Sequence, residues 1–269
     1  MRFFKEVQRA TLKTNQYIND NSGSLLDLLL FLLTPIIALD VLRQLFTTGG
    51  LFWTIMTLAY IGFFALIPTL WMRSTVESQN PERDFISYLG SPRTYLTALI
   101  LILIPIAYSY IPAMANMTNS LTIQTFDYSS DYLAVLLYIL FTALILRFSF
   151  IIPLYNSGLT LKSGQAFSAM RGKILILVAT IIKAALPLII FSLIYGLFIM
   201  PWMVEQFFTD INPKLITMIL IAPVKYLAVP LIMIYGFTAL AYHYANYAKQ
   251  YLVMSKAAPP KAGDKTSIN

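Results

Sequence analysis

Six long apolar runs, separated by short polar stretches, divide the 269-residue chain. Each run has about 20 or more mostly apolar residues, the length that an α-helix needs to cross a hydrocarbon core of ~30 Å. The runs are rich in Leu and Ile without strict alternation, which predicts helices and not the strands of a barrel. The predicted spans are Leu25–Phe46, Leu51–Trp71, Tyr95–Met114, Tyr132–Leu154, Ile174–Met200 and Leu215–Tyr242. The pattern therefore predicts an all-α, polytopic membrane protein with six transmembrane helices in one domain, residues 25–251.

Residues 1–24 form a mostly polar segment with helical amphipathicity. One face of this helix would carry the apolar positions Phe3, Val7, Ala10 and Thr11, with Phe4 beside them. The opposite face would carry the cations Arg2, Lys5, Arg9 and Lys13. This pattern predicts a helix in the cytoplasmic interface with its cations toward anionic headgroups, although a solvated helical tail fits the same residues. Ser24 and Asp27 then resemble a capping box that starts the first span.

Composition supports membrane insertion and removes several enzyme classes. The chain is 58% hydrophobic and 12% charged, with a mean hydropathy of +0.70. No small-residue cleavage site follows the first run, so we expect that run to remain as a helix. The chain has no cysteine, which excludes disulfides, thiolate nucleophiles and cysteine metal sites.

Charge predicts the orientation of the spans. Fourteen lysines and arginines fall in the N-terminal tail, the second and fourth inter-helix loops and the C-terminal tail, whereas the other side has only Arg43 and Lys214. Because cations are retained in the cytoplasm, both termini are predicted to be cytoplasmic. The net charge of +7 is then a topology signal, and we expect no nucleic-acid partner. Residues 252–269 are predicted to be a disordered basic tail.

Three cations fall inside predicted spans, where charge is costly. Lys183 and Lys225 would each lie ~14–15 Å from the start of their span, and Arg147 ~10 Å from the cytoplasmic end of its span. A charge at a helix centre costs about 2.5–3.5 kcal/mol, so a partner, a wet cavity or loss of the proton is required. The candidate counter-ions are Asp40 and Asp27, both in the first half of the chain. Three cations against two acids leave one positive charge in excess, which suits an anionic ligand, although lysines that join helices or partner subunits fit equally.

Prolines recur at similar distances in the two halves of the chain. Six pairs are separated by 118 to 121 positions, and "IPIAYSYIP" (104–112) matches "APVKYLAVP" (222–230) at several side chains. This spacing favours two inverted three-helix repeats, 25–118 and 132–242, an arrangement that places ligand sites between the halves. Helices of similar length bounded by proline would give the same spacing. At the site between the halves, helix breaks are expected at Pro105, Pro112, Pro187, Pro223 and Pro230.

The loop between the fourth and fifth spans contains a short amphipathic stretch. Its candidate partner-docking residues are Gln165, Phe167, Met170 and Arg171. Docking to a cytoplasmic partner and simple placement at the interface both fit this pattern.

Catalytic patterns are missing from the sequence. The single histidine, His243, lacks the further ligands that a metal site needs, and no Ser–His–Asp set or phosphate-binding loop is evident. We therefore expect no enzyme activity, no catalytic residue, no cofactor and no metal.

The stretch "RFSFIIPLYNSGLTLKSGQAFSAMRGK" (147–173) carries two resemblances. Through Arg147, Phe150, Pro153, Gly158, Ala166 and Ser168 it resembles a family of six-helix bacterial inner-membrane proteins, which includes YciC-like proteins and the membrane domains of some glycerophosphodiester phosphodiesterases. That resemblance implies a bacterial inner-membrane location. The stretch is also similar to the coupling loop of ABC-transporter permeases, with Gln165-Ala166-Phe167 in place of Glu-Ala-Ala.

These observations predict a permease-like inner-membrane protein that binds or moves an anionic or lipidic ligand at a cationic mid-membrane site. The expected ligand contacts are Lys183, Lys225 and Arg147, with Asp40 as counter-ion. The alternative is a non-catalytic accessory or structural subunit of a larger membrane complex. Expected partners are membrane lipids, partner membrane subunits or further copies of the chain.

Overall fold

The computed structural model describes residues 2–45, 50–77, 85–121, 129–153, 170, 172–207 and 219–257, and all regular structure among them is helical. The helices are α1 Arg2–Asp20, α2 Ser22–Leu45, α3 Leu51–Glu77, α4 Phe85–Leu89, α5 Pro92–Leu121, α6 Ser129–Phe148, α9 Ile174–Ile194, α10 Met200–Phe207 and α12 Val229–Ala257. Two π-helical turns, η1 Tyr195–Ile199 and η2 Val224–Ala228, interrupt the last two apolar runs. The predicted all-α class is thus confirmed for the described residues.

Four stretches are long and apolar enough to cross a membrane, which indicates a membrane-embedded protein. They are Ser22–Arg43, Leu51–Thr75, Ile174–Gln206 and Ile219–Asn246. The other two predicted spans fall on α5 and α6, where the apolar stretches Pro92–Ile104 and Val135–Arg147 are shorter. Six crossings therefore stay a prediction.

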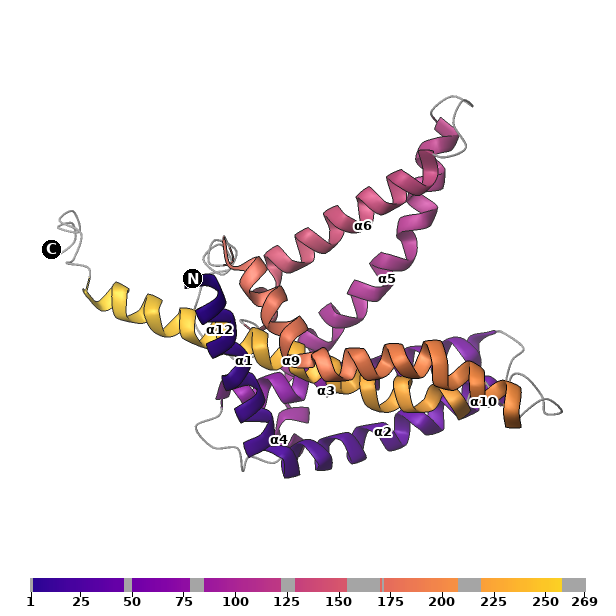
Figure 1. Ribbon diagram of the computed structural model, residues 1–269, viewed down its shortest axis with the longest axis horizontal. Coiled ribbons are helices and arrows are strands. Elements are labelled where there is room, and N and C mark those ends of the chain that lie inside the picture. The colour runs from indigo at the N-terminus through magenta and orange to yellow at the C-terminus, as the bar shows by residue number, and fades with distance from the viewer. Residues whose placement is uncertain are drawn as a thin grey trace, which may run out of the picture.

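The four long stretches pack side by side as a bundle. Helix α2 packs on α3, α3 on α12 and α12 on α9. Helix α2 therefore lies on one side of α3, whereas α12 and α9 lie on its other side (Figure 1). Helices α5 and α6 form a hairpin that joins the bundle through α3 and then diverges from it (Figure 1). Helix α1 crosses the end of the bundle at which α2 and α9 begin (Figure 1).

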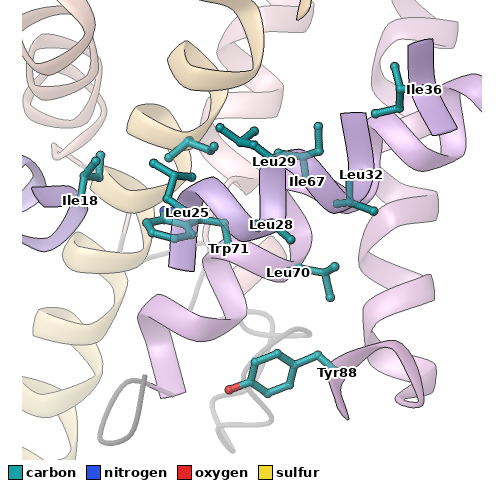
Figure 2. Close-up of a cluster of buried hydrophobic side chains, with 11 residues drawn as sticks. Ile18, Leu25, Leu28, Leu29, Leu32, Ile36, Ile67, Leu70, Trp71 and Tyr88 are labelled. Carbon is teal, nitrogen blue, oxygen red and sulfur yellow. The ribbon is translucent and has the colours of Figure 1, made fainter. Parts of the chain in front are cut away.

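A buried apolar cluster ties α1, α2, α3, α4 and α12 together. Helix α2 contributes the row Leu25, Leu28, Leu29, Leu32 and Ile36, whose three- and four-residue spacing puts them on one helical face. Figure 2 shows this row against Ile67, Leu70 and Trp71 of α3. The Trp71 indole also donates a hydrogen bond of 2.7 Å to Thr238 Oγ1 of α12. These contacts fix α2, α3 and α12 in register.

The predicted amphipathic N-terminal helix is present as α1, and its narrow apolar face packs on protein. Val7, Ala10, Thr11, Thr14 and Ile18 are buried, and the helix contacts α9 and α12. Phe3 and Phe4, expected on this face, are instead 38% and 74% exposed.

The boundaries at both ends differ from the sequence prediction. Helix α2 begins at Ser22, because the Asn21 carbonyl accepts the hydrogen bond of the Leu25 amide, so Ser24 does not cap it. Helix α12 continues to Ala257, beyond residue 252 where a disordered tail was predicted. Residues 258–269 lie outside the described part of the chain.

Candidate functional site

Asp40 is a carboxylate on the buried face of α2. It follows Ile36 by one helical turn, on the face that carries the leucine row, and it is only 1% exposed. A charged carboxylate at such a position needs hydrogen-bond partners, because burial without them is costly. Local sequence therefore puts an acid against α3 and α12.

Among the described residues, three donors from two elements reach this carboxylate. Arg43, one turn along α2, donates from Nη2 to Oδ1 at 2.9 Å. The Lys225 ammonium of η2 donates to Oδ2 at 2.5 Å, and the neighbouring Tyr226 hydroxyl donates to the same oxygen. Asp40 thus joins the first and second halves of the chain.

Tyr60 of α3 completes the cluster with its ring. The Arg43 guanidinium lies 5.1 Å and the Lys225 ammonium 5.3 Å from the centre of that ring, and Lys225 also lies 5.2 Å from the ring of Tyr226. Distances of this size allow cation–π attraction. We call Asp40, Arg43, Tyr60, Lys225 and Tyr226 the Asp40 cluster.

A π-helical turn brings Lys225 and Tyr226 to the same acid. Pro223 precedes η2, and the amide of Val229 bonds to the carbonyl of Val224, five residues back. Pro230 comes next, and its ring would clash with the Tyr226 carbonyl in a regular α-helix. The widened turn avoids that clash, and such turns often occur at functional sites.

Counted over the described residues, the Asp40 cluster carries one positive charge in excess, since two cations face one carboxylate. The side chains of Arg43 and Lys225 are 24% and 26% exposed, whereas Asp40 is buried. An ammonium has three N–H donors and a guanidinium five. Among the described residues each cation gives one hydrogen bond, to Asp40, so most of their donors are available to an anion.

The cluster lies toward one end of the bundle and not at its middle. Asp40 is five residues, ~8 Å, from the end of α2 at Leu45. Lys225 is six residues, ~9 Å, past Ile219, where the described part of the last span begins. By the predicted topology this end is the non-cytoplasmic one.

Lys183 does not join the Asp40 cluster. It is exposed on α9. A Cβ added at Gly236 of α12 would lie 3.7 Å from Ile181 Cγ2, so Gly236 faces Ile181. Lys183, two residues further along α9, therefore lies near the level of Ile234. Ile234 lies nine residues, ~14 Å, along the helix from Lys225. The two lysines expected to share a site are therefore far apart.

Arg147 also lies elsewhere. It occupies the last turn of α6, three residues before Phe150, whose ring packs edge-on against Tyr244 at 5.7 Å. The structure thus brings together Asp40 and Lys225 of the four predicted site residues.

The predicted docking stretch is described only at Met170. Gln165, Phe167 and Arg171 lie outside the described residues. Met170 is fully buried in the same apolar cluster as Phe150 and Tyr244, which also includes Leu177 of α9 and Leu240 of α12. Its side chain packs inside the protein, which corrects its expected place on an exposed docking face.

Sequence reasoning missed Arg43, Tyr60 and Tyr226 as members of the cluster. Arg43 was counted as a loop cation, yet its three-residue spacing from Asp40 predicts a pair on one helical face. Tyr226 adjoins Lys225 in sequence, but consecutive residues of an α-helix point in different directions, and the π-turn is not evident from the sequence. Tyr60 carries no sequence signal of its role.

His243 lies beside Thr180, with 3.4 Å between Nε2 and Oγ1. Within the described ranges no group of three His, Cys, Asp or Glu side chains is arranged to hold a metal ion.

Comparisons with protein-family models, with curated proteins and with solved structures gave no match to this chain.

Proposed function

We propose that this protein is a permease-like protein of the bacterial inner membrane that binds, and by binding helps to move, an anionic or lipidic ligand. The proposal includes six crossings in two inverted halves, both termini in the cytoplasm, and no catalytic activity. The ligand group is a phosphate or a similar anion, held by Arg43 and Lys225 between two tyrosine rings.

One observation carries the proposal: two partly exposed cations share a single buried carboxylate. A structural ion pair needs only one cation for each carboxylate. The second cation adds a positive charge that the described surroundings do not neutralise. An anionic ligand supplies the missing charge.

The position of the cluster between the halves supports movement of the ligand. Asp40 and Arg43 come from the first half and Lys225 and Tyr226 from the second, so a ligand bound to both cations bridges them. Pro223 and Pro230 surround the turn that carries the second-half contacts, as expected for discontinuous helices at transporter sites. In contrast, α5 continues as a helix through Pro105 and Pro112, and α9 through Pro187.

Opposite charge changes in the cluster test the proposal. Lys225→Met removes the excess charge, whereas Asp40→Asn raises it to two. Both variants lose an ion pair and should unfold at a lower temperature. Lys225→Met should weaken anion binding about tenfold or more, because a charge-assisted hydrogen bond contributes about 1.5–3 kcal/mol. Asp40→Asn should strengthen it.

The measurement is thermal stabilisation of the purified full chain by titrated probes. The probes are inorganic phosphate and short-chain phosphatidylglycerol, which separate a free anion from a lipid headgroup, with short-chain phosphatidylcholine as the zwitterionic reference. Arg93→Met, an exposed cation at the start of α5, is the matched control and should bind as wild type.

The accessory-subunit alternative predicts a different result. If the Asp40 cluster only joins helices, both variants lose stability and neither changes the response to any probe. That outcome would overturn the ligand-binding proposal.

A further inference from the structure

A lysine and an aspartate in the described spans are exposed and have no partner among the described residues. Lys183 lies on α9 and Asp27 on α2, and both side chains are exposed. Neither makes a hydrogen bond or an ion pair with any residue that the structure describes. Lys183 lies nine residues, ~14 Å, into α9, where an unpaired charge costs about 2.5–3.5 kcal/mol, and Asp27 lies five residues, ~8 Å, into α2. A partner from outside the described fold would remove the cost of both charges.

The two residues have opposite charges and lie at nearly the same depth. Leu25 lies beside Trp71 (Figure 2), and Trp71 bonds to Thr238 of α12. Gly236, two residues before Thr238 on α12, faces Ile181 of α9. Asp27 and Lys183 come two residues after Leu25 and Ile181 respectively. Helices α2 and α9 run in the same direction (Figure 1). Asp27 and Lys183 therefore lie within about one helical turn, ~5 Å, of the same level.

Equal depth is the condition for pairing between identical copies in a membrane. A rotation about an axis along the membrane normal keeps every residue at its own level. Two groups can therefore meet across a rotational interface only if their depths agree. Asp27 of α2 meets this condition for Lys183. Glu205 of α10, which is also exposed, does not, because it lies 22 residues further along the chain than Lys183.

The surfaces around the two charges are apolar and uncovered. Exposed neighbours on α9 are Ile182, Leu186 and Ile190, and on α2 they are Leu26, Leu30 and Phe31. Gly23, one turn before Asp27, has open space at its Cβ position. A small residue on such a face lets another helix approach closely.

We propose that a second copy of this chain occupies the α9 face, with Asp27 of one copy paired to Lys183 of the next. Because α2 and α9 lie on opposite sides of α3 and α12, the contact is head-to-tail. Repeated around an axis along the membrane normal, it closes into a ring of identical copies. Every Lys183 and every Asp27 is then neutralised. The interface uses none of the residues of the Asp40 cluster.

Charge reversal tests the pair. We expect Lys183→Met and Asp27→Asn each to lower the oligomeric fraction about tenfold in the gently extracted full chain, measured by native mass as multiples of 30.4 kDa. The double variant Asp27→Lys with Lys183→Asp restores the pair with reversed polarity and should restore the oligomer. The control Lys13→Met should leave it unchanged.

Disulfide cross-linking tests the register without altering either charge, because the chain has no cysteine. Leu30 and Leu186 each follow the paired charge by three residues. Two differently tagged variants, Leu30→Cys and Leu186→Cys, should cross-link when co-expressed. Phe198→Cys, exposed ~18 Å further along the α9 run, should not cross-link to Leu30→Cys.

Three outcomes would overturn the proposal. They are a monomeric mass for the wild type, an oligomer that persists unchanged in both single variants, and cross-linking that does not distinguish Leu186 from Phe198. Loss of a bound lipid or of an unrelated protein in Lys183→Met, with no change in self-association, would also overturn it.

Discussion

Asp40 is fully buried, and its two oxygens accept hydrogen bonds from a guanidinium, an ammonium and a phenol. The cost of burying the carboxylate is thus offset by three charge-assisted bonds. The sequence predicted that Asp40 pairs with a base from the second half, because an acid and a lysine within apolar spans both need a partner. It could not predict that Lys225 and not Lys183 is that base, since both occupy similar apolar contexts.

Tyr226→Phe isolates the phenol in this arrangement. The variant keeps the ring beside Lys225 and removes one donor from Asp40, so we expect a loss of about 1–3 kcal/mol in the free energy of unfolding. Tyr60→Phe is the matched control, because Tyr60 contributes its ring to the cations and should lose less. Equal effects in the two variants, measured by denaturation in detergent, would show that the Tyr226 hydroxyl bond does not stabilise the fold.

At the scale of elements, η1 and η2 share a proline placement. Each turn is followed by one further residue and then by Pro201 or Pro230, and the residue before the proline bonds five positions back. The prolines were evident from the sequence, but their effect was not. Pro35, Pro68 and Pro187 lie within α-helices without such a turn. Which prolines widen a helix depends on packing that a single sequence does not encode.

Pro230→Ala tests whether the turn orients the Asp40 cluster. Alanine restores the amide and removes the clash with the Tyr226 carbonyl, which favours a regular α-helix and shifts Lys225 and Tyr226 relative to α12. We expect anion-induced stabilisation to fall about as far as in Lys225→Met. Pro201→Ala makes the same change at η1, away from the cluster, and should bind the probes as wild type. Unaltered binding in Pro230→Ala would show that the turn is not needed.

At the scale of the whole molecule, the sequence predicted helical spans and an amphipathic N-terminal helix but not their neighbours. Lipid tails are as apolar as leucine, so an apolar helix face does not reveal whether it contacts lipid or protein. The divergence of the α5–α6 hairpin was therefore not predictable. Nor was the packing of α1 on α9 and α12, because its apolar face fits a headgroup layer equally well.

Ala10→Leu tests the packing of α1. Ala10 is 1% exposed, so the larger side chain should force α1 away from α9 and α12 at a cost of about 1–3 kcal/mol. Limited proteolysis of the purified chain should then cleave within α1 more rapidly than in wild type. Gln8→Leu, an exposed position on the same helix, is the control. Equal cleavage rates would show that this contact does not hold α1.

The contact of α1 with α12 also sets an order of events during synthesis. The ribosome completes α1 at Asp20, but α12 begins only at Val229. At about 5–20 residues per second, roughly 10–40 s separate the two. For that interval α1 has no α12 to pack on, and its four cations can hold it at the membrane surface. The packing of α1 is therefore completed only when α12, the last of the described helices, has been made.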